Sequence, residues 1–66
     1  MKITVNNKQY EANEGVTISA LISELGYGAN GVAVAMHDTV IPRVQWGEYT
    51  LSEGDSLIIF QAVSGG

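Results

Sequence analysis

Residues 16–26 have the sequence VTISALISELG, and this stretch decides the fold of the chain. Within it, apolar residues recur at positions i, i+3, i+4 and i+7, the spacing of one face of an α-helix: Ile18, Leu21, Ile22 and Leu25. Thr17 can cap the helix N-terminus, and Gly26 can adopt the left-handed conformation that commonly ends a helix. Val16 can pack on Leu21 in front of the first turn. The stretch therefore predicts a single amphipathic helix.

The residues before this helix predict a β-hairpin. Met1, Ile3 and Val5 alternate with polar residues, as expected for a strand with one buried face. Asn6-Asn7 follows, and asparagine tolerates the left-handed geometry of a tight hairpin turn. Residues 8–12 then return as the second arm.

The residues after the helix predict further strands. Leu57 to Val63 form the longest apolar run and are the candidate central strand. Between the helix and this strand, the sequence predicts a strand at 32–36, a turn at 37–39 and an extended piece at 40–41. A helical turn at 45–47, an extended piece at 49–51 and a tight turn at 52–55 then lead to the last strand at 57–63.

This order of elements predicts an α+β roll, in which one helix covers one face of a mixed four- to five-stranded sheet. If the first and last strands are neighbours, they must run parallel, because the helix connects them as a crossover. That arrangement is the β-grasp fold. The predicted core between helix and sheet consists of Ile3, Val5, Ile18, Leu21, Ile22, Leu25, Val34, Leu57 and Ile59.

The last strand carries two apolar rows, so its register is ambiguous. We predict that Leu57 and Ile59 face the helix. The opposite row would then lie on the uncovered face of the sheet and, with Ala33 and Ala35, form an apolar patch suited to docking a partner. That row consists of Ile58, Phe60 and Ala62.

Length and composition predict a single domain over residues 1–66, with a tail at 64–66. The chain has no cysteine, which excludes disulfides and thiolate metal sites. Its net charge of −4 disfavours binding to nucleic acid and favours protein partners with basic surfaces. Because no stretch is long and apolar enough for a membrane span or a signal peptide, we expect a soluble, cytoplasmic protein.

Several motifs that suggest chemistry have simpler interpretations. Residues 26–31, GYGANG, fit the pattern G-x-G-x-x-G, but they follow a helix and precede a strand, the reverse of a dinucleotide site. His37 is the only histidine and is expected to be a solvated turn residue. The carboxylates are scattered, so no metal site is predicted. Trp46 is expected to seal an edge of the core, and no catalytic triad is recognisable.

The sequence ends in Ser64, Gly65 and Gly66, and this tail has two interpretations. It is either an idle end or a segment that, lacking bulky side chains, threads a narrow channel in another protein. In the second case the terminal carboxylate would be the reacting group, once adenylation had given it a good leaving group. Both interpretations predict a flexible tail in the free protein.

Taken together, these segments resemble the family of thiamine-biosynthesis sulfur carrier proteins (the ThiS family) in the ubiquitin-like β-grasp superfamily. The resemblance covers the whole chain, and its most specific part combines Pro42-Arg43, Trp46, Gly54-Asp55 and Gly65-Gly66. His37 departs from the family, which more often has asparagine in this turn. The matching pieces are MKITVNN (1–7), TISALISELG (17–26), VAVAMHDTVIPRVQW (32–46), LSEGDSLIIF (51–60) and SGG (64–66).

The resemblance implies that the chain is a carrier and not an enzyme. A ubiquitin-activating-like adenylyltransferase would use ATP and magnesium, neither bound by this chain, to adenylate Gly66. Persulfide sulfur from a sulfurtransferase or cysteine desulfurase would then give a C-terminal thiocarboxylate. Thiazole synthase would take that sulfur to build the thiazole ring.

Two alternatives stay open from the sequence. The small subunit of molybdopterin synthase also ends in Gly-Gly, although it is usually longer and lacks the pattern from Pro42 to Trp46. The chain could instead be a β-grasp interaction module without carrier activity, in which case removal of Gly65 and Gly66 would leave its role intact.

Overall fold

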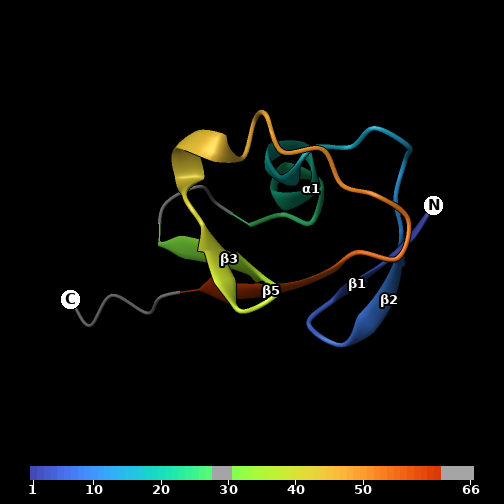
Figure 1. Cartoon of the computed structure of the whole chain (residues 1–66), viewed down its shortest axis with the longest axis horizontal. Coiled ribbons are helices and arrows are strands. Elements are labelled where there is room, and N and C mark those ends of the chain that lie inside the picture. Colours follow the sequence, from blue (N-terminus) through green and yellow to red (C-terminus); the bar gives the residue numbers. More distant parts are fainter. Residues whose placement is uncertain (28–30, 62–66) are drawn as a thin grey trace.

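The computed structural model describes residues 1–27 and 31–61. In this part of the chain, five strands form a single sheet in the order β2-β1-β5-β3-β4, and α1 lies over one of its faces (Figure 1). The elements are β1 (Lys2–Val5), β2 (Lys8–Glu11), α1 (Ile18–Glu24), β3 (Val32–Met36), β4 (Thr39–Ile41), the 3₁₀ turn η1 (Arg43–Gln45) and β5 (Ser56–Gln61).

The central pair of strands confirms the predicted topology. β1 and β5 are parallel neighbours, with Thr4 opposite Ser56 and Val5 opposite Leu57. The pairs β1–β2, β3–β4 and β3–β5 are antiparallel. A parallel pair needs a crossover connection, and α1 lies within the segment that joins β1 and β2 to the rest of the sheet. The fold is therefore the expected β-grasp roll.

The N-terminal hairpin turns at the predicted asparagines. Asn6 and Asn7 have φ angles of 52° and 69°, the left-handed values that a two-residue hairpin turn of this kind requires. The return strand ends at Glu11, one residue before the predicted end. The amino group of Met1 then donates a hydrogen bond to the carbonyl of Ala12 at 2.7 Å.

The helix begins and ends as its sequence predicts. The Thr17 hydroxyl accepts a hydrogen bond from the Ala20 backbone N–H at 3.1 Å, and both Val16 and Leu21 are buried. Gly26 has a φ of 85°, the left-handed conformation that ends the helix. Leu25 is only half-buried because it is already the C-cap, where the chain leaves the core.

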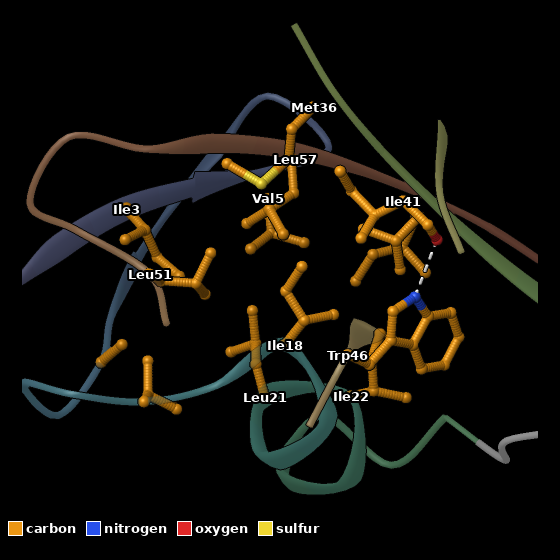
Figure 2. Close-up of a cluster of buried hydrophobic side chains, with 14 residues drawn as sticks. Ile3, Val5, Ile18, Leu21, Ile22, Met36, Ile41, Trp46, Leu51 and Leu57 are labelled. Atoms are coloured by element: carbon orange, nitrogen blue, oxygen red, sulfur yellow. Dashed lines mark hydrogen bonds between the residues drawn. The ribbon is translucent and has the colours of Figure 1, made fainter. Parts of the chain in front are cut away.

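The core fills the space between α1 and the sheet (Figure 2). Leu57 and Ile59 are buried beneath the helix, which confirms the predicted register of the last strand. The other predicted core residues are also buried, apart from the half-buried Leu25. The structure also buries Val16 and Trp46, which were predicted to pack beside the core, and it adds four members that the prediction omitted: Ala12, Met36, Ile41 and Leu51.

The helical turn before Trp46 was predicted two residues too late. It spans Arg43–Gln45, not 45–47, because Pro42 is already its N-cap residue and the Pro42 carbonyl accepts a hydrogen bond from the Gln45 N–H at 2.9 Å. Trp46 is buried, and its indole Nε1–H donates to the Ile41 carbonyl at 3.0 Å (Figure 2). The indole therefore closes the edge of the core, as expected.

The connection from η1 to β5 contains little regular structure. Of the extended piece predicted at 49–51, only Thr50 pairs, in an isolated bridge with Thr17. The tight turn at 52–55 is confirmed, with Gly54 at φ 83° and a hydrogen bond from the Asp55 N–H to the Ser52 carbonyl at 3.0 Å. Residues 62 and 63 of the predicted last strand lie outside the described residues.

Candidate functional site

The predicted reacting group, the carboxylate of Gly66, follows β5 in the sequence. Ser64, Gly65 and Gly66, like Ala62 of the predicted patch, are outside the described residues. The strand that leads to them is described as far as Gln61, which pairs with Val32 of β3. β5 lies between β1 and β3: β1 pairs with its first two residues, and β3 pairs with it as far as Gln61.

The face of the sheet opposite α1 carries the second apolar row of β5. Phe60 is 53% exposed and Ile58 is half-buried. Their cross-strand neighbours on β3, Ala33 and Ala35, are also half-buried, and their small side chains leave the phenyl ring uncovered. The structure thus confirms that Ile58 and Phe60 face away from the helix.

Sequence reasoning missed Val40 on this face. Val40 is 62% exposed and lines a shallow hollow with Ile58, Phe60 and Ala35. The signal was present in the sequence, because Val40 alternates with the buried Ile41 in β4 and must therefore point to the opposite face. We call Ala35, Val40, Ile58 and Phe60 the open-face patch.

The turn between β3 and β4 adds polar groups to the rim of the open-face patch. His37 and Asp38 line the same hollow, and both are exposed, as expected for a solvated turn. Their φ angles of 52° and 63° are left-handed, like those of the asparagine turn between β1 and β2. Histidine is tolerated at such a left-handed position more readily than most residues, so His37 is compatible with this turn.

A second groove lies between the β1–β2 hairpin and the end of α1. Its wall includes Tyr10, Leu25 and Tyr27, with Lys8 at its edge. Partial burial raises the pKa of the Tyr10 phenol, and a hydrogen bond to the Glu24 carboxylate and that group's negative charge raise it further. A phenol with a raised pKa stays protonated, so Tyr10 is not an activated nucleophile.

The remaining motifs belong to the scaffold. The first glycine of GYGANG follows α1 and the last, Gly31, precedes β3, which is the wrong context for a dinucleotide loop, while residues 28–30 lie outside the described part. Within residues 1–27 and 31–61, histidine and carboxylate side chains nowhere gather in a group able to hold a metal ion. Neither helix in these ranges has the length and apolar character needed to cross a membrane.

The profile of the ThiS family matches residues 3–66 of the sequence. The chain belongs to the ThiS family. It is 30% identical over 66 residues to the sulfur carrier protein ThiS of Escherichia coli (strain K12), and the match covers all of both chains. Membership of the ThiS family makes it a sulfur carrier of thiamine biosynthesis, and it favours this pathway over the molybdopterin alternative.

Solved structures of the ThiS family have the same fold. The crystal structure of the thiamine biosynthesis protein ThiS from Geobacter metallireducens superposes with a TM-score of 0.84 at 28% sequence identity, covering all of both chains. An NMR structure of a thiamine biosynthesis protein from the same organism gives a TM-score of 0.81 at 28% identity, covering all of this chain and 88% of the other. The ubiquitin-like β-grasp assignment rests on both the topology and these matches.

The ThiS-like sequence also occurs inside longer proteins. Thiazole synthases from Paramagnetospirillum magneticum and Magnetococcus marinus are 29% and 32% identical to this chain over 66 residues. In each case the match covers all of this chain but only 20% of the relative.

Proposed function

We propose that the chain carries sulfur as a thiocarboxylate on Gly66. The observation that supports this most is the match to the E. coli sulfur carrier, which runs through the last residue of both sequences. The two terminal glycines add a chemical reason, because a residue without Cβ can pass through a channel too narrow for other side chains.

The proposed chemistry begins with activation of the Gly66 carboxyl group. The Gly66 carboxylate attacks the α-phosphate of ATP, which releases pyrophosphate and leaves an acyl adenylate. A persulfide sulfur then attacks the acyl carbon and expels AMP, and a second thiol cleaves the resulting S–S bond, so that the thiol is oxidised and the thiocarboxylate is released. Adenylation is required because a free carboxylate is a poor electrophile and its oxygen a poor leaving group.

The proposal places all catalytic groups on the partners. A ubiquitin-activating-like adenylyltransferase would hold ATP and magnesium, and a sulfurtransferase or cysteine desulfurase would supply the persulfide. This chain would contribute the reacting carboxyl group, the glycines that deliver it, and a surface by which the partners recognise it. It is therefore a co-substrate and not an enzyme.

We assign that recognition to the open-face patch together with Ala62. Phe60 is a large apolar side chain, more than half exposed, on the strand that leads to the reacting group. Aromatic residues, phenylalanine among them, are enriched at protein interfaces relative to the rest of the surface. The net charge of −4 would assist docking to partners with basic surfaces.

Thiazole synthase is the proposed acceptor of the sulfur. The thiazole synthases of P. magneticum and M. marinus each contain a segment similar to this chain. The presence of both in one protein supports the proposal that carrier and synthase act together. In that reaction the acyl carbon would lose its sulfur to the acceptor and gain an oxygen from water, which restores the carboxylate for another cycle.

The test is intact-mass analysis after incubation with the cognate adenylyltransferase, ATP, magnesium and a persulfide source. We expect a mass change equal to the replacement of one oxygen by sulfur, localised to Gly66 by fragmentation. One residue appended after Gly66 should abolish the change, and Gly65→Val should sharply reduce it. Equal thiolation of the untrimmed, extended chain would show that Gly66 is not the acceptor.

A further inference from the structure

The first strand is too short to support the whole of the central strand. β1 ends at Val5, opposite Leu57, whereas β5 continues to Gln61. On its other side, β5 stays paired with β3 as far as Gln61. The part of β5 that leads to the tail would therefore lack a partner on the β1 side beyond Leu57.

The Asn6 side chain supplies one further step of this ladder. The Thr4 N–H donates to the Asp55 carbonyl at 2.8 Å, and the Asn6 N–H donates to the Leu57 carbonyl at 3.0 Å. At the next position along β5, the Ile59 N–H donates to Asn6 Oδ1 at 2.7 Å, and Asn6 Nδ2 donates to the Ile59 carbonyl at 3.3 Å. The amide thus takes the place of the strand residue that β1 no longer provides.

The residue type explains how one position serves both the turn and the ladder. At Asn6 the backbone has already turned away with a φ of 52°, which asparagine tolerates. Its side chain still reaches β5 with one acceptor and one donor, the pair that a backbone peptide would offer. Asn7, at φ 69°, shares the turn geometry, but no side-chain hydrogen bond of Asn7 occurs within the described residues.

We propose that Asn6 is a positioning residue for sulfur transfer: by holding Ile59 it fixes the end of β5 from which the tail departs. Phe60, the proposed docking anchor, is the next residue, so the same two hydrogen bonds orient both the recognition surface and the approach to Gly66. The role in sulfur transfer rests on the function proposed above, whereas the support of β5 is independent of it.

The first test measures amide hydrogen exchange at Ile59. Asn6→Gly keeps the left-handed turn but removes the amide, and Asn7→Gly makes the same change at the neighbouring position as a matched control. Asn6 is exposed, so neither variant opens the core. We expect exchange at Ile59 to accelerate about fivefold in Asn6→Gly, the loss of one ordinary hydrogen bond, and to stay unchanged in Asn7→Gly.

The second test measures the kinetics of carrier adenylation at a temperature well below unfolding. We expect Asn6→Gly to raise the KM for the carrier about fivefold with kcat unchanged, because a frayed strand must be ordered when it binds. Asn6→Asp, which retains the acceptor for the Ile59 N–H, should give an intermediate KM. Thr17→Ala, which lowers global stability by removing the helix cap, should leave KM unchanged.

The outcomes separate this inference from the proposed function. The positioning role is supported if Asn6→Gly shows faster exchange at Ile59 and a raised KM while, of the two control variants, Asn7→Gly leaves the exchange unchanged and Thr17→Ala leaves the KM unchanged. An unchanged KM in Asn6→Gly, or an equal rise in Thr17→Ala, overturns it while leaving the carrier function intact. If the native chain is not adenylated at all, the proposed function fails and the role of Asn6 in sulfur transfer fails with it.

Discussion

The two faces of β5 both carry apolar residues, but one face is buried and the other is exposed. Leu57 and Ile59 are 0% and 6% exposed beneath α1, whereas Phe60 on the other face is 53% exposed. Both rows are apolar, and the single helix can cover only one of them. The difference shows that apolar residues in this strand have two environments: one row is buried in the core, and the other stays exposed, where we propose that it binds a partner.

The largest effect should come from the covered face. Leu57→Ala leaves a cavity in a fully buried site and should lower the free energy of unfolding by about 3 kcal/mol. Ile58→Ala, the adjacent apolar residue on the open face, is the matched control and should cost about 1 kcal/mol or less. Chemical denaturation of both variants measures the contrast, and equal losses would mean that the two faces are not energetically distinct.

A smaller loss is expected at the edge of the covered face. Trp46→Phe removes the donor to the Ile41 carbonyl and part of a buried ring, and should lower the free energy of unfolding by about 2 kcal/mol. Val44, which is 87% exposed in η1, provides the control, because Val44→Ala should change stability by less than about 0.5 kcal/mol. A thermal unfolding series that ranks Val44→Ala as the more damaging change would contradict this assignment.

On the open face the expected effect is on binding. Phe60→Asp should weaken binding to the adenylyltransferase and to thiazole synthase about tenfold, by replacing an apolar anchor with a charge. Its stability should change less than its affinity. Thr39→Asp introduces the same charge at an exposed position on the other side of the sheet and should bind normally. Unimpaired binding of a badly destabilised Phe60→Asp protein would place Phe60 in the core.

The smallest effect on stability is expected for the tail. Ser64, Gly65 and Gly66 contain little apolar surface, so their removal should leave the unfolding midpoint unchanged. The same truncation should abolish thiolation, because it removes the proposed acceptor. Calorimetry of the truncated protein measures its unfolding midpoint, and intact-mass analysis of the same sample measures its thiolation. A marked fall in the midpoint would show that the tail supports the fold.

Much of this fold could be predicted from local sequence signals. The spacing of Ile18, Leu21 and Ile22 fixed the helix face, and the Asn6-Asn7 pair fixed the hairpin. The choice between the two rows of β5 could not be derived from periodicity alone, because both rows are apolar. It depends on which row meets the helix stripe in three dimensions.

The errors have local causes. The turn before Trp46 was placed late because Pro42 was treated as the end of an extended piece and not as the start of a helical turn. The site was predicted in part. Ile58 and Phe60 were found, whereas Val40 was missed although its alternation with Ile41 marked its face. The support of β5 by Asn6 depends on a contact between residues far apart in sequence, which no local pattern reveals.

The parallel pairing of β1 with β5 also has a mechanical consequence. The start of β1 and the end of β5 lie at opposite ends of the pair, so a pull on the tail against an anchored N-terminus draws the two strands past each other along their length. Under such a load the hydrogen bonds of Thr4, Asn6 and Leu57 resist together, whereas a hairpin pulled at its open end would separate one bond at a time. A partner that draws the tail into its channel would therefore pull against the part of the sheet best arranged to resist it.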